Sequence, residues 1–382
     1  MRFETYTLAE LATIKYGKNQ KKVQSPTGTI PIYGTGGLMG YASKALYDKP
    51  SVLIGRKGTI GKVKYAERPF WTVDTLFYTI VNTDIVLPRY LYYVMSLLDL
   101  NAYNEGTTIP SLRTETLNRL QFAIPPLDDQ AKILSVVLPL EYKIAVNDEI
   151  NKNLEQQAKA VFKSWFVDFE PFGGVQPSEM QFIPLQELCK VVTKGTTPTT
   201  LGKSFTSSGI NFIKAESILD NHSIDSSKFA FIDEETNALL KRSIIKANDI
   251  VFTIAGTLGR FAMVDNSVLP ANTNQAVAII RPDEAKITPA YLYSFFIGNF
   301  HNEYYSKIIQ QAVQANLSLT TIKSLLIAVL NNTTMSNYDK LVSPLFALMK
   351  NNEEENRRLS KLRDALLPKL MSGELDVSDI SL

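Results

Sequence analysis

Apolar residues in two long stretches of the chain recur at alternating spacings of four and three residues. One stretch runs from Ile133 to Trp165 and the other from Val342 to Leu370. This alternation is typical of α-helices that pair as a coiled coil. We therefore predict two long helices that pack against each other.

Each stretch carries asparagine at two positions of its apolar stripe, and the two pairs lie 205 residues apart. Asparagine in the seam of a helix pair costs stability but fixes the register. We therefore predict that the helices pair in one register. The residues predicted to pair them are Asn147, Asn151, Leu154, Asn352, Asn356 and Leu359.

Other residues of these stretches carry expectations of their own. Pro139 and Pro344 have the same separation as the asparagines. Because proline inside a helix costs about 3 kcal/mol, we expect a kink or a helix start just before Leu140. Trp165 and Phe166 flank the first seam, and we interpret them as exposed apolar residues that need a partner.

The segments that precede the two helices also repeat. Glycine pairs follow strand-like runs in 51–65 and 250–264, and proline begins amphipathic helices at 87–98 and 288–298. The predicted fold class is α+β, with two pseudo-twofold-related α+β domains separated by a long two-helix coiled coil. The linker FVDFEPFGGVQPSEM is long enough to reverse the chain, which favours antiparallel helices. The predicted segments are a first domain (1–127), a first helix and linker (128–174), a second domain (175–336) and a second helix and tail (337–382).

Charge distinguishes the two domains. The net charge of all 382 residues is +2, but residues 1–127 carry +6 and residues 175–336 carry zero. A basic first domain hints at a polyanionic partner. No apolar run approaches the roughly 20 residues of a membrane span, and the N-terminus lacks the apolar region of a signal peptide. The single cysteine, Cys189, fits a reducing cytoplasm.

The sequence shows no pattern of catalytic residues. The two histidines, His222 and His301, are far apart and have no carboxylate pattern near them. The segment GRKGTIGK lacks the spacing of a phosphate-binding loop, and no Ser or Thr follows Lys62. We therefore expect a binding protein with no metal site, and an enzyme with an unrecognised phosphate loop is the weakest alternative.

Five segments, in this order, resemble the specificity subunit of type I restriction–modification systems along nearly the whole chain. They are IYGTGGLMGYASKALYDKPSVLIGRKGTIGKV, KAVFKSWFVDFEPF, TKGTTPTT, KANDIVFTIAGTLGR and LRDALLPKLMSGEL. The resemblance implies a non-catalytic subunit with two target-recognition domains, each of which reads one half of a split site in double-stranded DNA. It also implies that the two helices form a spacer, a stiff ruler between the half-sites.

The same resemblance implies the partners. Methyltransferase subunits, two of them, would dock on the spacer, together with restriction (translocase) subunits. S-adenosylmethionine, ATP and Mg²⁺ would bind those subunits, and no cofactor is expected on this chain. Two other interpretations stay open: the recognition subunit of a fused restriction–methylation enzyme, and a cytosolic coiled-coil scaffold that binds proteins.

Candidate DNA contacts come from residue types that bind phosphates or base edges, and from glycine turns that let the backbone approach closely. In the first domain they are Tyr33, Gly34, Gly36, Arg56, Lys57, Thr59, Lys62 and Lys64. In the second domain they are Lys194, Thr196, Thr197, Thr257, Arg260, Asn272, Asn274 and Gln275. Arg260 occupies the position of Lys62 in the repeat. The bases that are read do not follow from these residue types.

Overall fold

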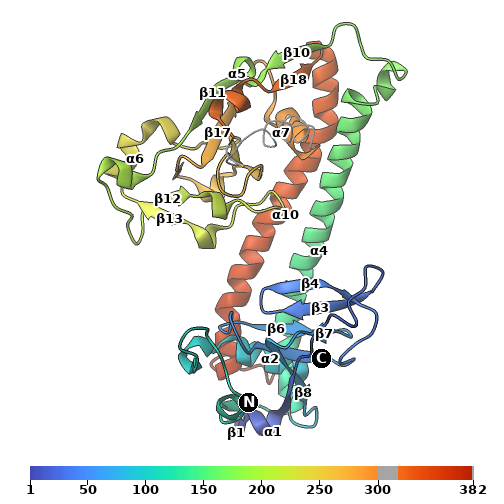
Figure 1. Ribbon diagram of the computed structural model, residues 1–382, viewed down its shortest axis with the longest axis vertical. Coiled ribbons are helices and arrows are strands. Elements are labelled where there is room, and N and C mark those ends of the chain that lie inside the picture. The colour runs from blue at the N-terminus through green and yellow to red at the C-terminus, as the bar shows by residue number, and fades with distance from the viewer. Residues whose placement is uncertain (299–316, 381–382) are drawn as a thin grey trace. The chain divides into compact units, whose positions relative to one another are not determined.

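The fold of the chain comes from a computed structural model that describes residues 1–298 and 317–380 (Figure 1). Residues 1–146 together with the segment that begins at Glu355 form unit 1, and residues 147–354 form unit 2. Each unit therefore contains one sheet-rich domain and part of each long helix. Within the described residues, no helix is both long enough and apolar enough to cross a membrane.

The main sheet of unit 1 has four antiparallel strands in the order β2-β8-β5-β6. Its strands are β2 (Ala12–Tyr16), β8 (Leu76–Val81), β5 (Ser51–Gly55) and β6 (Val63–Ala66). Every residue of β5 is buried, because both faces of this central strand are covered. This explains why the segment reads as a continuous apolar run rather than as an alternating one.

Two smaller sheets and three short helices complete the domain of unit 1. A three-stranded sheet has the order β4-β3-β7, with β3 parallel to β7. Its strands are β3 (Ile30–Gly34), β4 (Gly37–Ala42) and β7 (Trp71–Thr72). A two-stranded sheet joins β1 (Glu4–Thr7) and β9 (Gln121–Ile124). The helices are α1 (Leu8–Leu11), α2 (Pro88–Ser96) and α3 (Thr114–Asn118).

Unit 2 repeats this topology strand for strand. Its sheets have the orders β11-β17-β14-β15, β13-β12-β16 and β10-β18, and β12 is parallel to β16. The strands are β10 (Gln181–Pro184), β11 (Cys189–Lys194), β12 (Ile210–Ile213), β13 (Ala230–Ile232), β14 (Ile250–Thr253), β15 (Phe261–Met263), β16 (Ala271–Thr273), β17 (Val277–Pro282) and β18 (Leu326–Val329). The α-helices in the described part of this domain are α5 (Leu185–Leu188), α6 (Glu234–Leu239), α7 (Pro289–Ile297) and α9 (Leu319–Lys323). The predicted duplication of an α+β domain is confirmed.

The long helices are α4 (Leu127–Phe166) and α10 (Asn332–Ser372). Both helices continue through their prolines, so the prediction of a helix start just before Leu140 is wrong. Pro139 and Pro344 lie on the exposed side of each helix, where a missing backbone N–H leaves a carbonyl that water can reach.

The two helices run antiparallel in each unit taken by itself. In unit 1, the Asn356 side chain bonds the Ile144 carbonyl at 3.5 Å, and Arg363 lies 3.8 Å from Glu141. In unit 2, Asn352 bonds Asn151 at 2.8 Å, and the Phe162 ring lies 6.3 Å from the Tyr338 ring. In both units, contacting residues with higher numbers in α4 pair with residues of lower number in α10. This confirms the antiparallel pairing that the length of the linker favoured.

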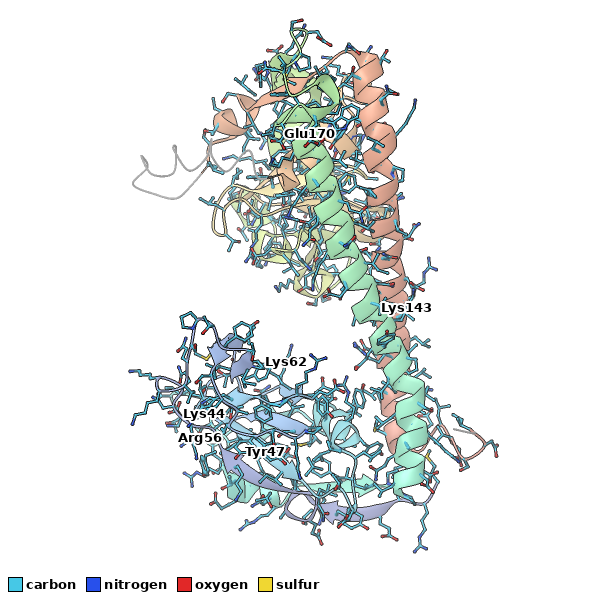
Figure 2. All side chains as sticks on the ribbon, turned by 90° about the vertical axis from the view of Figure 1, so that its right-hand side faces the viewer. Lys44, Tyr47, Arg56, Lys62, Lys143 and Glu170 are labelled. Carbon is cyan, nitrogen blue, oxygen red and sulfur yellow. The ribbon has the colours of Figure 1, made fainter. Side chains whose placement is uncertain are left out.

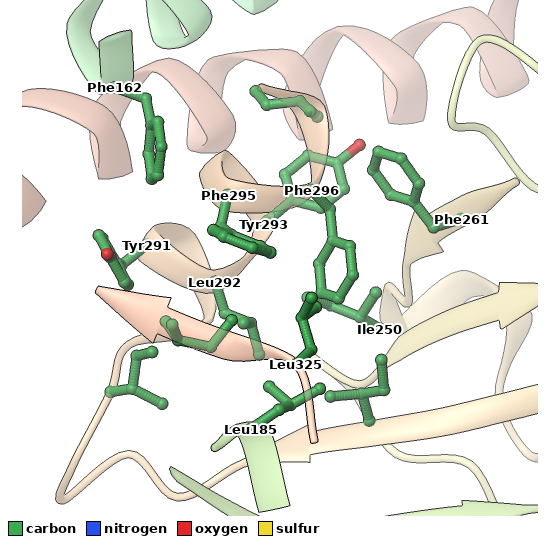
Figure 3. Close-up of a cluster of buried hydrophobic side chains, with 14 of the residues drawn as sticks. Phe162, Leu185, Ile250, Phe261, Tyr291, Leu292, Tyr293, Phe295, Phe296 and Leu325 are labelled. Atoms are coloured by element: carbon green, nitrogen blue, oxygen red, sulfur yellow. The ribbon is translucent and has the colours of Figure 1, made fainter. Parts of the chain in front are cut away.

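The core of unit 2 joins its domain to the end of α4 (Figure 3). The Phe166 side chain is only 7% exposed, and its ring lies 4.9 Å from that of Tyr291 in α7 and 5.1 Å from that of Tyr338 in α10. Trp165 is half-buried and packs on Tyr338 at 5.6 Å. The interpretation of these residues as exposed is wrong, because the domain of the same unit covers them.

Candidate nucleic-acid interface

In unit 1, three loops meet around the Arg56 side chain. Its guanidinium lies 5.1 Å above the exposed Tyr16 ring at the end of β2 and donates a hydrogen bond of 2.9 Å to the Asp74 carbonyl. Its backbone N–H bonds the Thr75 carbonyl at 2.8 Å. These contacts hold a half-buried cation at a fixed place beside a hollow of about 390 Å³. The hollow is also lined by the cations Lys57 and Arg113 and by the anion Glu115.

The loop that follows Arg56 presents exposed polar side chains: Lys57, Thr59 and Lys62. Gly58 has φ +87°, a conformation that L side chains rarely adopt. At Gly61, a Cβ would lie 2.3 Å from the side-chain amide nitrogen of Asn101, so the loop packs closely there. Figure 2 labels Arg56 and Lys62 on this domain. An ordered loop with several exposed cations is suited to phosphate contacts.

Lys64 holds the turn of the β3–β4 hairpin. Its ammonium group donates hydrogen bonds to the carbonyls of Gly34 at 3.1 Å and Thr35 at 2.8 Å. Burial lowers the pKa of Lys64. Because its hydrogen bonds are directed at the backbone, the structure gives Lys64 a positioning role.

The other three candidates at this turn differ in exposure. Tyr33 is half-buried, with its ring 6.5 Å from that of Phe70, and burial raises its pKa. Gly34 is buried under the Met39 side chain, and Gly36 is exposed at the tip. Of the three, Gly36 alone presents its backbone to the surroundings.

In unit 2, the structure brings five candidates together at the end of β11. They are Lys194, Thr196, Thr197, Asn274 and Gln275. The Thr197 hydroxyl donates a hydrogen bond to the Gln275 amide oxygen, and the Gly195 N–H bonds the Asn274 carbonyl at 3.1 Å. Two segments that are about eighty residues apart in the sequence thus form one loop cluster.

Arg242 joins this cluster and was not among the candidates. Its guanidinium lies 3.5 Å from the Lys194 carbonyl and 3.4 Å from the Thr196 hydroxyl. The adjacent cations Lys241 and Arg242 are the sequence signal that could have identified it. With Lys194 it gives the electroneutral domain a local concentration of positive charge.

Two of the three remaining candidates of unit 2, Asn272 and Arg260, are already engaged by other residues of the unit. Asn272 is fully buried, and its amide group donates to the Asn237 side chain at 2.8 Å and to the Leu240 carbonyl at 3.3 Å. The prediction that Asn272 contacts a base is therefore wrong, because its side chain is enclosed and its amide group already has hydrogen-bond partners. Arg260 makes a two-pronged ion pair with Asp220, at 2.6 and 2.7 Å. Thr257 is exposed in the glycine turn before it.

The two domains place different residues at one equivalent backbone position. The Arg56 N–H donates a hydrogen bond to the Thr75 carbonyl, and the Arg56 carbonyl accepts one from the Leu112 N–H. Ile254 makes the same two backbone hydrogen bonds in unit 2, to the Ala276 carbonyl and from the Leu317 N–H. Ile254 is buried, whereas the Arg56 side chain reaches the loops. The backbone framework is repeated, and the side chains at the loops are not.

The close approach of the chain at Gly17 is one part of this shared framework. A Cβ at Gly17 would lie 2.0 Å from the Val73 carbonyl oxygen, and at Gly195 it would lie 1.9 Å from the Thr273 carbonyl oxygen. Both glycines follow the first strand of the main sheet, β2 or β11. No other residue type fits there without displacing the neighbouring backbone.

The helix-pairing candidates lie along the facing sides of α4 and α10. Asn147, Leu154 and Asn352 are buried, and Asn151, Asn356 and Leu359 are half-buried. The Asn151 amide group also donates a hydrogen bond of 3.2 Å to the Met349 carbonyl.

The chain is similar to proteins that recognise DNA. A family model for the type I restriction modification DNA specificity domain matches residues 2–156 and again 177–329. The type I restriction enzyme MjaIX specificity subunit of Methanocaldococcus jannaschii is 26% identical over 357 residues, which cover 88% of this chain and 80% of that protein. The HindI specificity subunit of Haemophilus influenzae is 26% identical over 385 residues, with 80% and 81% covered.

The fold is also similar to a solved structure. The crystal structure of a type I restriction–modification S subunit from M. genitalium matches with a TM-score of 0.61 at 18% identity, and the match covers 97% of this chain and 96% of that one. At this level of identity, the similarity concerns the fold.

Proposed function

The chain belongs to the family of type I restriction–modification DNA specificity domains, and on that premise we propose that its two domains each read one half of a bipartite site in double-stranded DNA. It is a DNA sequence-specificity subunit of a type I restriction–modification complex. One observation carries the bipartite reading: the same strand topology occurs twice, with different side chains at equivalent loop positions. A repeated framework supplies the same approach to DNA, and different loops supply different base preferences.

Unit 1 would supply more of the electrostatic attraction. Its loops carry Arg56, Lys57 and Lys62. In unit 2, the residue that corresponds to Lys62 is Arg260, and Asp220 neutralises its charge. Phosphate contacts dominate affinity and bring a strong dependence on salt. Unit 2 would rely more on its local cluster around Lys194 and Arg242.

The helices α4 and α10 would act as the spacer between the half-sites. Each runs through both units as one continuous element, and each seam contains polar residues that favour one register. Lengthening both helices by one heptad adds about 10 Å, or about three base pairs, to such a ruler. The unread spacer should lengthen accordingly, and the bases read at each half-site should stay the same.

The partners follow from the same proposal. Two methyltransferase subunits and the restriction (translocase) subunits would dock on this chain in the cytoplasm. They would bring S-adenosylmethionine, ATP and Mg²⁺, and this chain would be the non-catalytic recognition component.

Methylome sequencing tests the proposal directly. Genomic DNA from cells with an intact gene for this chain should show a methylated, asymmetric, two-part motif, and deletion of the gene should abolish methylation at that motif. Complementation with the intact gene should restore it. A methylome without a bipartite motif that depends on this gene would contradict the proposal.

A further inference from the structure

The β3–β4 hairpin of unit 1 exposes large apolar side chains that cover no core of the described structure. Leu38 is 56% exposed, Met39 is 53% exposed and Tyr41 is 46% exposed. Leu38 and Met39 are adjacent exposed residues of β4, at a register shift of the β3–β4 pair between Ile32 and Tyr33, where the regular alternation of side chains is interrupted. β4 is also the edge strand of its three-stranded sheet (Figure 1). Apolar groups exposed in this way indicate a contact with another molecule.

The hairpin has a defined position beside the cationic loop of unit 1. Lys64 bonds the carbonyls of Gly34 and Thr35 at the turn, and the Tyr33 carbonyl accepts a hydrogen bond of 3.1 Å from the Val73 N–H. A Cβ at Gly58 would lie 3.9 Å from the Thr35 hydroxyl. The turn therefore lies next to the loop that carries Arg56, Lys57 and Lys62.

Charge indicates what the hairpin contacts. Between Glu10 and Asp48 the sequence contains five lysines and no acidic residue. The hairpin lies in the middle of this stretch, and the Ser25 N–H bonds the Tyr41 carbonyl, which places the segment after Lys21 and Lys22 along β4. An exposed apolar hairpin within a lysine-bearing segment is suited to a polyanion that also offers apolar groups.

DNA has both properties in its major groove. A two-stranded β-ribbon fits the groove, and the C5-methyl group of thymine is its exposed apolar feature. We propose that the β3–β4 hairpin reads base pairs of the first half-site from the major groove, with Leu38 and Met39 in contact with thymine methyl groups. The inference rests on the proposed DNA-reading function and names the element and the base feature through which unit 1 performs it.

The corresponding part of unit 2, which lies within the described residues, has no such exposed apolar hairpin. Its outer strand, β13 (Ala230–Ile232), is half-buried or buried throughout. The sequence around it is rich in acidic residues, with six from Glu216 to Glu235, both included. We therefore expect an apolar hairpin to contact thymine methyl groups only at the half-site that unit 1 binds.

The test uses the complex isolated through an affinity tag on the full chain and a duplex that carries the motif methylated in vivo. A second duplex has deoxyuridine in place of thymine at one half-site, and a third has it at the other, so that only C5-methyl groups are removed. Wild-type binding should weaken about fourfold for each contacted methyl group lost from one half-site. The doubly substituted chain, Leu38→Ala with Met39→Ala, should bind the thymine and deoxyuridine duplexes equally.

Leu97→Ala is the matched control, because Leu97 is 44% exposed on the same unit and lies at the end of α2. It should keep the full response to deoxyuridine. Thermal unfolding of each variant checks that the fold is intact, and the wild-type comparison of duplexes needs no substitution at all.

Three outcomes would overturn the inference, and they are distinguishable. Sequence-specific binding with no response to deoxyuridine at either half-site would refute the hairpin contact and leave the proposed function standing. Loss of a protein subunit from the Leu38→Ala, Met39→Ala complex, with the response to deoxyuridine unchanged, would assign the hairpin to a protein partner. Absence of any sequence-specific binding would refute the proposed function as well.

Discussion

The Asn352 side chain donates a hydrogen bond of 2.8 Å to the side-chain oxygen of Asn151, and this bond joins α10 to α4 in unit 2. Asn352 is buried and Asn151 is half-buried. Polar groups at such a site favour the alignment in which they meet, because any other register leaves them in apolar surroundings.

Removal of one partner should therefore cost stability. Asn352→Ala leaves the Asn151 oxygen without this donor and should lower the free energy of unfolding by about 1 kcal/mol. Replacement of both residues by Leu should restore or raise stability and reduce register specificity. Urea unfolding of Asn151→Leu, Asn352→Leu and the variant that carries both substitutions forms a double-mutant cycle. Asn351→Ala, on the exposed side of the same helix, is the control, and an equal loss there would refute the argument.

Arg56→Ala should weaken DNA binding and flatten its dependence on salt. Loss of one phosphate contact should reduce the slope of log K against log salt by about 0.9. Dissociation constants measured at several salt concentrations on the methylated motif give the slope. Arg119→Ala removes an exposed cation from the same unit and should leave the slope unchanged. Equal slopes for the Arg56 variant and the wild type would remove Arg56 from the interface.

Arg260→Ala should behave differently, although Arg260 matches Lys62 in the repeat. Its ion pair with Asp220 engages the guanidinium, and Asp220 itself is largely exposed. Such a pair contributes at most about 1 kcal/mol to stability. We expect a small loss of stability and an unchanged salt slope, and Asp220→Asn should have the same effect on stability. A slope change as large as that of Arg56→Ala would instead indicate a phosphate contact.

His222 should make the stability of unit 2 depend on pH. Burial lowers the pKa of His222, with a further lowering by Lys159, whereas Glu155 and Asp220 oppose the shift. The unfolded side chain binds its proton near pH 6.5, and the folded one binds it only at lower pH. Stability contributed by neutral His222 is therefore fully present above a pH of about 6.5 and is lost as the pH falls towards the folded pKa.

The measurement is the free energy of unfolding across this range for the wild type and for His222→Asn. Asparagine tolerates the backbone conformation at this position, where φ is +63°. The variant should show a shallower decline in acid. The other histidine, His301, lies outside the described residues and is present in both proteins, so the difference isolates His222. Parallel pH curves would contradict the expected role.

Several features of this protein are determined by the sequence alone. The 4-3 spacing predicts the two long helices, because helical periodicity is a local property of the chain. The repeated glycine and proline segments predict the duplicated α+β domain, since both copies build the same turns and helix starts from the same local signals. The family follows from these same segments, because their order along the chain is itself a property of the sequence.

Only the tertiary structure decides which candidate side chains remain available. Asn272 and Phe166 look like surface residues by type or position, but segments distant in the sequence bury them. Arg260 looks like a free cation until Asp220, forty residues earlier, engages it. Burial and pairing depend on neighbours that folding brings from elsewhere in the chain. Periodicity within one segment therefore predicts the elements, and the contacts between segments decide what each loop can touch.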